Sequence, residues 1–415
     1  METTVKLLRY LVVVVIVAIL GGVAGWFFFV RSNQGAVSEV AGNGGSEEQT
    51  PLFDDEMGSS AVDVRTSTEE AAAAPAGPRS IERLWRADRG PVAGYSFIAQ
   101  KKNATSSIHL YFIERANGNV FDADAVEQTT MRLTNTLIPK VYEAVVAPTG
   151  GSALLRSLDG EVITTLLASF ATPASTTTFP QALVGTTLPA DIRSIAIDPD
   201  PKTGLLFYLE PGTAGGVVGM LSSIADAKPQ QLFSSPLESW RAQFAGGKVI
   251  LLLSPADDMP GYAYTLSSGG ALSLLAGPTF GLMILPHPSQ EALLYSSSSG
   301  GRLSLYAQVG KDAPTQLSVQ TVAEKCVWAP NSTSIVYCAV PRAVPRNGFI
   351  NAWYRGSLHT SDTWWQIDLQ NGTAEELFTP TTPLDVHDPR IDPSGSYIAF
   401  TNGVDLSLWV LRIVQ

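Results

Sequence analysis

The sequence predicts an all-β protein: a seven-bladed β-propeller preceded by one transmembrane helix and a disordered linker. Three observations lead to this prediction. They are an uncharged apolar run near the N-terminus, an acidic segment after it, and a hairpin pattern that recurs along the rest of the 415 residues. Because 45% of the residues are hydrophobic, the chain has enough apolar surface for a large core.

The first element is a membrane anchor. Residues 10–30, YLVVVVIVAILGGVAGWFFFV, contain no charged residue. At about 1.5 Å per residue, a helix of this length spans a hydrocarbon core of about 30 Å. Lys6 and Arg9 precede it, which places residues 1–9 in the cytoplasm and the folded part outside. We expect a single-pass protein of the cell membrane; a cleaved signal peptide is the alternative, although its apolar region is usually shorter.

Residues 31–78 are interpreted as a flexible acidic linker. Between residues 32 and 78, nine acidic residues stand against one basic residue, Arg65. Such a segment buries too little apolar surface to offset the entropy lost on ordering. The whole chain has a net charge of −11 and no basic stripe, which argues against nucleic acid as a partner.

A repeat of two apolar strands joined by a polar turn fills residues 79–415. In the clearest copies the first strand ends at a proline, which stops its hydrogen bonding, and small polar residues form the turn. These copies are VVAPTGGSALLRS (145–157), AIDPDPKTGLLFYL (196–209), LPHPSQEALLYSS (285–297), VWAPNSTSIVYCA (327–339) and RIDPSGSYIAFTN (390–402). Residues 243–254 and 94–113 are looser copies, so that the total is seven. Apolar runs such as LLFYL predict strands covered on both faces.

Third and fourth strands follow the hairpins, and four strands per unit at a spacing of about 41 to 63 residues are typical of a propeller blade. The last unit ends without its fourth strand, whereas SIERLWRA (80–87) precedes the first unit and is similar to the fourth strands elsewhere. We therefore predict that residues 80–87 complete the last blade and close the ring. A pair of β-sandwiches is the alternative, but sandwiches do not require a hairpin that recurs seven times.

Both cysteines, Cys326 and Cys338, belong to one of these hairpins. With the turn centred on Ser332, Trp328 pairs with Val336 and Cys326 with Cys338, which brings the cysteines near disulfide distance. An extracytoplasmic location favours the oxidised state, and we predict a disulfide. The alternatives are a zinc site, for which closely spaced histidines are missing, a catalytic thiol, for which no activating base is seen, and two buried thiols.

Common catalytic motifs are missing from the sequence. There is no G-x-S-x-G, no G-x-x-x-x-G-K-[ST] and no H-E-x-x-H. The acids of FDADAVE (Asp122, Asp124, Glu127) and DPDP (Asp198, Asp200) lack the spacing of a calcium loop, and we interpret them as solvated turn residues. The sequence thus predicts no catalytic residue, no metal, no cofactor and no enzymatic activity.

A long excursion, PRAVPRNGFINAWYRGSLHTSDTWW (341–365), interrupts the sixth unit. Loops on a rigid scaffold commonly carry function, and Trp, Tyr and Arg often anchor interfaces. The candidate binding residues are Arg346, Trp353, Tyr354, Arg355 and His359. In the alternative, the loop folds over the rim and buries its own aromatic residues, as we expect for Trp364 and Trp365 within the third strand.

The hairpins IDPSGSYIAF and WAPNSTSIVY resemble the repeats of TolB-like, WD-type bacterial propellers. The segments ERANGNVFDAD, RLTNT, EKCVWAPNSTSIVYCAVP, NAWYRGS and LSLWVL are similar to uncharacterised propeller proteins of small-genome bacteria that carry a single membrane anchor. The resemblance covers residues 80–415 and implies a propeller on an anchor. It transfers no catalytic residue. It implies no Tol-type partner either, since the additional N-terminal domain of TolB is missing here.

These observations predict a membrane-anchored, extracytoplasmic binding or scaffolding module that holds a protein, a peptide or a glycan at its rim or central funnel. The rival is a propeller hydrolase or lyase whose carboxylates converge in the channel only in three dimensions. Acids and a histidine at the funnel mouth would favour the enzyme, and a channel of small apolar side chains would favour the binding module. A structural envelope component without a specific ligand is the third possibility.

Overall fold

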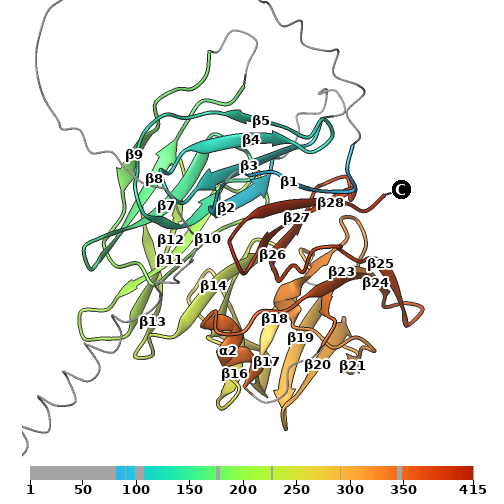
Figure 1. The fold of residues 1–415 in the computed structure, drawn as a ribbon. Helices are drawn as coiled ribbons and strands as arrows, with labels where there is room; N and C mark the ends of the chain where they lie inside the picture. The colour runs from blue at the N-terminus through green and yellow to red at the C-terminus, as the bar shows by residue number, and fades with distance from the viewer. Residues whose placement is uncertain are drawn as a thin grey trace, which may run out of the picture. The chain divides into compact units, whose positions relative to one another are not determined.

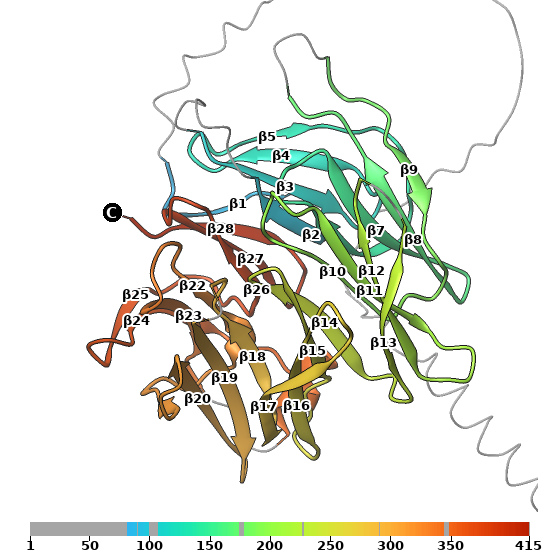
Figure 2. The ribbon, with the colours of Figure 1, turned by 180° about the vertical axis from the view of Figure 1, so that it is seen from behind.

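The computed structural model describes residues 81–88, 90–98, 107–173, 178–225, 228–289, 291–343 and 348–414. They form seven antiparallel four-stranded sheets around a central channel (Figures 1 and 2). The prediction of an all-β, seven-bladed propeller is confirmed. The predicted cytoplasmic N-terminus, transmembrane helix and linker lie outside the described residues. Within the described residues, no helix is long and apolar enough to cross a membrane.

In each blade the chain begins at the innermost strand and passes outward. Blade 1 contains β2 (Val92–Phe97), β3 (His109–Glu114), β4 (Val120–Asp124) and β5 (Thr129–Arg132). Blade 2 contains β6 (Val141–Val146), β7 (Ser152–Asp159), β8 (Val162–Ser169) and β9 (Val184–Thr187). Blade 3 contains β10 (Ser194–Ile197), β11 (Leu205–Pro211), β12 (Val217–Ser223) and β13 (Gln230–Ser235). Blade 4 contains β14 (Trp240–Ala245), β15 (Lys248–Leu253), β16 (Pro260–Leu266) and β17 (Leu272–Phe280).

The remaining blades follow the same path. Blade 5 contains β18 (Met283–Pro286), β19 (Ala292–Ser299), β20 (Arg302–Val309) and β21 (Thr315–Gln316). Blade 6 contains β22 (Cys326–Trp328), β23 (Ile335–Pro341), β24 (Asp362–Asp368) and β25 (Thr373–Phe378). Blade 7 contains β26 (Val386–Ile391), β27 (Tyr397–Asn402) and β28 (Leu408–Arg412), with β1 (Leu84–Arg86) outermost. Two short helices in the described residues, the 3₁₀ helix η1 (Ala323–Lys325) and α2 (Phe349–Tyr354), belong to connections.

The recurring prolines lie where the sequence analysis placed them, just beyond the innermost strand of a blade. Proline has no N–H to donate, so the strand pairing stops there and the turn begins. Blade 4 makes the turn differently: Gly246 and Gly247 both have positive φ, as a two-residue hairpin requires. The prolines that follow an innermost strand in this way are Pro148, Pro199, Pro288, Pro330 and Pro393.

The first strand to be described, β1, closes the ring. It pairs with β28 through Leu84 opposite Leu411 and Arg86 opposite Trp409, so the two ends of the described chain share one blade (Figures 1 and 2). The prediction that residues 80–87 complete the last blade is confirmed for its described part, in which Leu84–Arg86 form the outermost strand; residue 80 lies outside the described residues. Asp88 adds a further link, since its Oδ1 accepts the backbone N–H of Leu408 at 2.8 Å.

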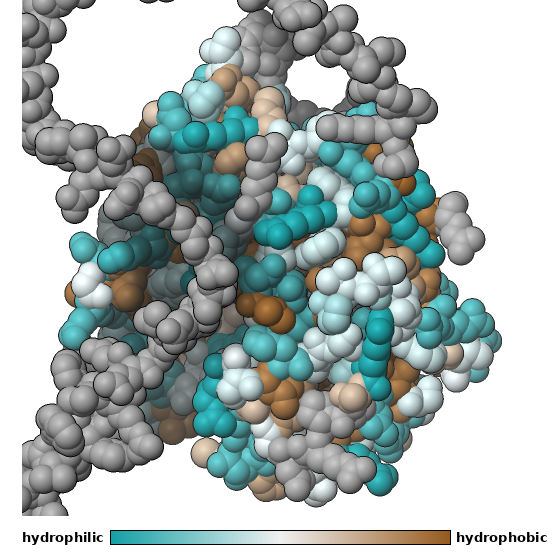
Figure 3. All heavy atoms as spheres, viewed as in Figure 1, coloured by the Kyte–Doolittle hydropathy of each residue, from teal (hydrophilic) through white to brown (hydrophobic). Residues whose placement is uncertain are grey.

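The core lies between adjacent blades. Phe112 of blade 1, for example, packs in one cluster with Tyr397 and Val410 of blade 7. Four consecutive residues of the LLFYL run, Leu206–Leu209, are buried, as expected for a strand covered on both faces. On the face shown in Figure 3, hydrophilic and hydrophobic residues are interspersed in small groups.

Candidate functional site

The central channel contains a cavity of about 850 Å³ lined by the innermost strands of all seven blades. Most of its lining side chains are small or apolar, such as Ala196, Val145 and Ile197. Phe97, Phe244 and Trp328 add aromatic surface. Turn prolines form part of the wall at the end where the innermost strands stop, which we call the turn face; they are Pro148, Pro199, Pro201, Pro288 and Pro393. Pro286 and Pro389, within β18 and β26, also line the cavity.

The few charged residues of the channel are paired with one another or with neighbours. Glu143 accepts a hydrogen bond from Arg156, which lies on the adjacent strand. Arg390 donates to Asp388 at 2.9 Å, and its guanidinium lies over the ring of Tyr95 at 5.3 Å. The channel therefore offers an apolar surface with little unbalanced charge.

A buried charged cluster lies at the other end of the blades, the entry face, where the innermost strands begin. Lys325 of η1 and Asp385, which precedes β26, meet Asp362 at the start of β24. The Lys325 Nζ donates to Asp362 Oδ2 at 2.5 Å and to Asp385 Oδ1 at 2.6 Å, and all three side chains are fully buried. A third donation from Nζ, to Thr360 Oγ1 at 2.7 Å, uses all protons of the ammonium group. We call Lys325, Thr360, Asp362 and Asp385 the lysine hub.

Two histidines contact the same oxygen of Asp385. His359 Nδ1 lies 3.1 Å and His387 Nε2 3.2 Å from Oδ2. An ionised carboxylate only accepts hydrogen bonds, so His359 Nδ1 and His387 Nε2 are the ring nitrogens that donate to it. The two imidazole side chains are about one-third exposed. A buried carboxylate that orients an imidazole is an arrangement used in general base catalysis.

The environment of Asp385 keeps it ionised. Burial alone would raise the pKa of this carboxyl, but the hydrogen bonds and charges of His387 and Lys325 outweigh burial and hold its pKa well below the usual range. Asp385 is therefore ionised at neutral pH. Its carboxylate accepts hydrogen bonds from the ammonium group of Lys325 and from both imidazoles.

The candidate binding residues in the excursion of blade 6 lie in different environments. Trp353 is buried: its Nε1 donates to Asp385 Oδ1 at 3.1 Å, and its ring lies 5.1 Å from the ammonium group of Lys325. Tyr354 and Arg355 are exposed. His359 lies on the hub, as described above, and Arg346 lies outside the described residues. The structure thus brings Trp353 and His359 together at Asp385.

Part of the excursion is self-packed. Trp364 is fully buried in β24, and Trp365 is partly buried, as expected for the third strand. The helix α2 also reaches across to blade 4, where the backbone N–H of Asn351 donates to Asp257 Oδ2 at 2.8 Å. Arg241 of β14 donates to the Tyr354 hydroxyl at 2.7 Å. These contacts join blades 4 and 6 over the entry face.

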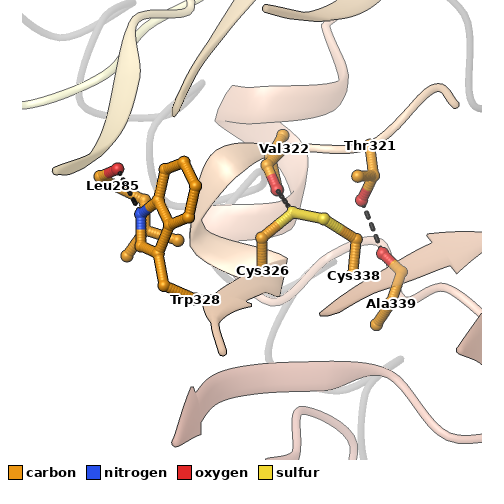
Figure 4. The surroundings of a disulfide bond; sticks show 7 residues. All are labelled: Leu285, Thr321, Val322, Cys326, Trp328, Cys338 and Ala339. Carbon is orange, nitrogen blue, oxygen red and sulfur yellow. Dashed lines mark hydrogen bonds between the residues drawn. A yellow bond between two sulfur atoms is a disulfide. The ribbon is translucent and has the colours of Figure 1, made fainter. Parts of the chain in front are cut away.

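The cysteines form the predicted disulfide in blade 6. Cys326 lies opposite Cys338 and Trp328 opposite Val336, the register expected from the turn. The two Cα atoms are 4.0 Å apart and the sulfur atoms are bonded (Figure 4). Nearby, Trp328 Nε1 donates to the carbonyl of Leu285 in blade 5 at 3.0 Å (Figure 4). The disulfide hairpin is therefore also attached to the neighbouring blade.

The interpretation of the turn acids as solvated needs correction for two of them. Asp122 is only 6% exposed and accepts from His109 Nδ1 at 2.9 Å. Asp198 is 1% exposed and accepts from Thr203 Oγ1 at 2.9 Å. Glu127 and Asp200 are exposed, and Asp124 accepts the backbone N–H groups of residues 126 and 127. The interpretation of Asp122 as a turn residue was wrong because Asp122 lies within β4, where the strand alternation turns its side chain inward.

Sequence reasoning also missed Lys325, Asp362, Asp385 and His387. One local signal was present, because Lys325 directly precedes the apolar strand Cys326–Trp328, where a charge is unusual unless it is paired. Its partners Asp362 and Asp385 follow 37 and 60 residues later. No short sequence motif links residues so far apart, so the pairing could not be recognised from the sequence.

No family model and no curated protein sequence matches this chain. Solved structures share its fold at low identity. A virginiamycin B lyase from Staphylococcus aureus is 11% identical with a TM-score of 0.50, over 80% of this chain and 98% of that chain. An oligogalacturonate lyase from Vibrio parahaemolyticus is 10% identical with a TM-score of 0.50, over 80% and 94%. The β-propeller domain of the Trilobed protease from Pyrococcus furiosus is 10% identical with a TM-score of 0.49, over 78% and 99%.

Proposed function

We propose that this chain is a binding module of the cell envelope, anchored through residues 10–30 and belonging to the group of single-span bacterial propellers that its sequence resembles. The observation that carries the proposal is the channel: a cavity of about 850 Å³ whose wall is mostly small, apolar and proline side chains. Pockets of this size and character are typical of binding sites.

A peptide or a protein loop is favoured over a glycan as the occupant. A sugar brings many hydroxyl groups, and each one loses free energy on burial unless it finds a hydrogen-bond partner. The charged groups of the wall, Glu143, Asp388 and Arg390, already have partners. Aromatic and proline surfaces from Phe97, Phe244 and Trp328 suit an extended apolar segment instead.

A photo-cross-linking amino acid at Ile197 tests this proposal in the full chain in its native membrane. Ile197 is part of the channel wall, and Leu274 on β17 is the matched control because it is exposed on the outermost strand of blade 4. We expect an adduct that contains a peptide at position 197 and not at 274, and loss of that adduct in Val145→Arg. Adducts with sugar alone, or equal adducts at both positions, contradict the proposal.

An enzyme acting at the entry face is the second candidate, and the pair His359 and His387 on Asp385 favours it. Two of the structures that share the fold are described as lyases, and a lyase needs a group that abstracts a proton. One such reaction is tested by incubating the full chain with oligogalacturonates and measuring the ultraviolet absorbance of the unsaturated product that a lyase would form. This candidate predicts a rise that is lost in His387→Gln; no rise rules out that substrate.

A further inference from the structure

Three side chains of blade 1 form a continuous hydrogen-bonded chain away from the channel. Ser107 Oγ lies 3.1 Å from His109 Nε2, and His109 Nδ1 lies 2.9 Å from Asp122 Oδ1. Ser107 precedes β3, His109 begins it, and Asp122 lies in the middle of β4. Because β3 runs back from the end of β2, the group lies toward the turn face, opposite the lysine hub.

The protonation pattern follows from the partners. The carboxylate of Asp122 only accepts hydrogen bonds, so Nδ1 of His109 carries the proton of the neutral ring. Nε2 then has the lone pair and accepts the hydroxyl proton of Ser107. Asp122 is 6% exposed, whereas the His109 side chain is 39% exposed and Ser107 is partly exposed. A buried acid thus orients a base that contacts the hydroxyl group of a partly exposed serine.

The charges around His109 fit this role. Its pKa is raised from the usual value chiefly by the hydrogen bond with Asp122; burial partly opposes the increase, and the charges of Asp122 and Asp124 add to it. Tyr111, two residues along the same strand, stays neutral because burial and the nearby charge of Asp122 raise its pKa well above the usual value. Among the described residues, the charges that act on the pKa of His109 are thus those of two acids, Asp122 and Asp124.

We propose that Ser107, His109 and Asp122 form a Ser-His-Asp acyl-transfer site that hydrolyses carboxylic esters. The two distances and the order of contacts are those of a serine nucleophile with its general base and orienting acid. This activity is independent of the proposed channel function.

The reaction has two balanced steps. Ser107 Oγ bonds to the ester carbonyl carbon while its proton passes to His109 Nε2; the ester C–O bond then breaks, and the leaving alcohol takes that proton. Water next attacks the acyl-serine and gives its proton to Nε2, and the bond from the carbonyl carbon to Ser107 Oγ breaks. Ser107 regains the proton and a carboxylic acid is released.

A second serine–histidine pair provides a matched control. Ser289 Oγ lies 2.7 Å from His287 Nδ1, and Ser289 is exposed. Among the described residues, however, the ring of His287 packs edge-on against Trp328 at 5.1 Å rather than against a carboxylate. If contact with an imidazole were enough to activate a serine, Ser289 would react as fast as Ser107.

The experiment treats the full chain with a fluorophosphonate probe and with p-nitrophenyl acetate, and locates the adduct by mass spectrometry. We expect the adduct on Ser107, none in Ser107→Ala, unchanged labelling in Ser289→Ala, and labelling about 100-fold slower in Asp122→Asn. Circular dichroism melting checks that each variant is folded. Labelling that persists in Ser107→Ala, or that falls equally on Ser289, overturns the proposal, as does the absence of any adduct.

The pH profile separates catalysis from a structural role. The neutral ring is the base, so the labelling rate of the wild-type chain should rise with pH through the raised pKa of His109. In Asp122→Asn the negative charge is lost and the midpoint should move to lower pH. An unmoved midpoint contradicts the role given to Asp122, even if the variant is less stable.

Discussion

At the scale of single residues, the lysine hub shows how a charge is tolerated inside a propeller. Removing Lys325, Asp362 and Asp385 from water costs several kcal/mol per ion, and this cost is offset only because each proton of the ammonium group has an acceptor. Trp353 closes the site by donating to Asp385 and by placing its ring near Lys325. The hub attaches the excursion of blade 6 to the start of blade 7.

Replacing Lys325 with Met should therefore destabilise the protein strongly. The variant leaves two buried carboxylates without their cation, and breaking a buried pair in this way typically costs about 3–5 kcal/mol. Urea denaturation of the full chain measures the loss. Lys202→Met, at an exposed turn position, is the control and should change the free energy of unfolding by less than about 0.5 kcal/mol. Equal effects of the two substitutions would show that the hub does not stabilise the fold.

The lysine hub should also make the free energy of unfolding depend on pH in the acidic range. The pKa of Asp385 is lower in the folded chain than in the unfolded chain. Its contribution is present above the unfolded value of about 4 and is lost as pH falls below it toward the folded value. The free energy of unfolding of the wild type should thus decrease below about pH 4, and the decrease should be smaller in Asp385→Asn. Denaturation series at several pH values measure both slopes; identical slopes contradict this account.

At the scale of elements, blade 6 combines a covalent and a non-covalent restraint. The disulfide joins β22 to β23 across a hairpin, while Trp328 on the same strand hydrogen-bonds to blade 5. The long excursion leaves the blade after β23 and returns at β24, with α2 bonded to Asp257 of blade 4. An insertion of this length is tolerated because its two ends are fixed by these strands and by the hub.

The double variant Cys326→Ala/Cys338→Ala should lower the free energy of unfolding by about 3 kcal/mol, because the cross-link closes a short loop of the unfolded chain. Chemical denaturation with and without a reducing agent measures this loss. The reducing agent should destabilise the wild type and leave the double variant unchanged. A wild type that is insensitive to complete reduction, verified by thiol titration, would contradict the expected contribution.

At the scale of the whole molecule, stability depends on ring closure. The seven blades contact each other through apolar faces, so a gap between any two blades exposes core on both sides. The join lies inside blade 7, where β1 supplies the last strand. Trp85 of that strand is buried in the cluster between blades 7 and 1. The segment that closes the ring thus also fills part of the core.

Deleting residues 1–88 should produce an aggregating or non-cooperatively melting protein, because β28 becomes an exposed edge and Trp85 leaves the core. Deleting residues 1–78 is the matched control, since it keeps β1. Light scattering and thermal melting compare the two. A soluble, cooperatively melting chain that begins at residue 89 would show that closure by β1 is dispensable.

Most of the fold could be predicted because its signals are local. Five of the seven hairpins have a proline, turn residues and apolar strands within about 15 residues, and the same pattern places Cys326 opposite Cys338. The closing strand was predictable because one unit lacks a strand that the N-terminal side can supply. Sites were less predictable: Trp353 is a buried support of the hub, and Asp122 faces a histidine on the neighbouring strand.

The sequence by itself determined the blade count, the hairpin register and the disulfide, because strand pairing between adjacent segments depends on turn chemistry and on a two-residue alternation. Only the tertiary structure decided which charges meet. Lys325, Asp362 and Asp385 come from different strands and connections, and Ser107, His109 and Asp122 meet across two strands. Their proximity results from packing of blades and from side-chain direction, which no short stretch of sequence encodes.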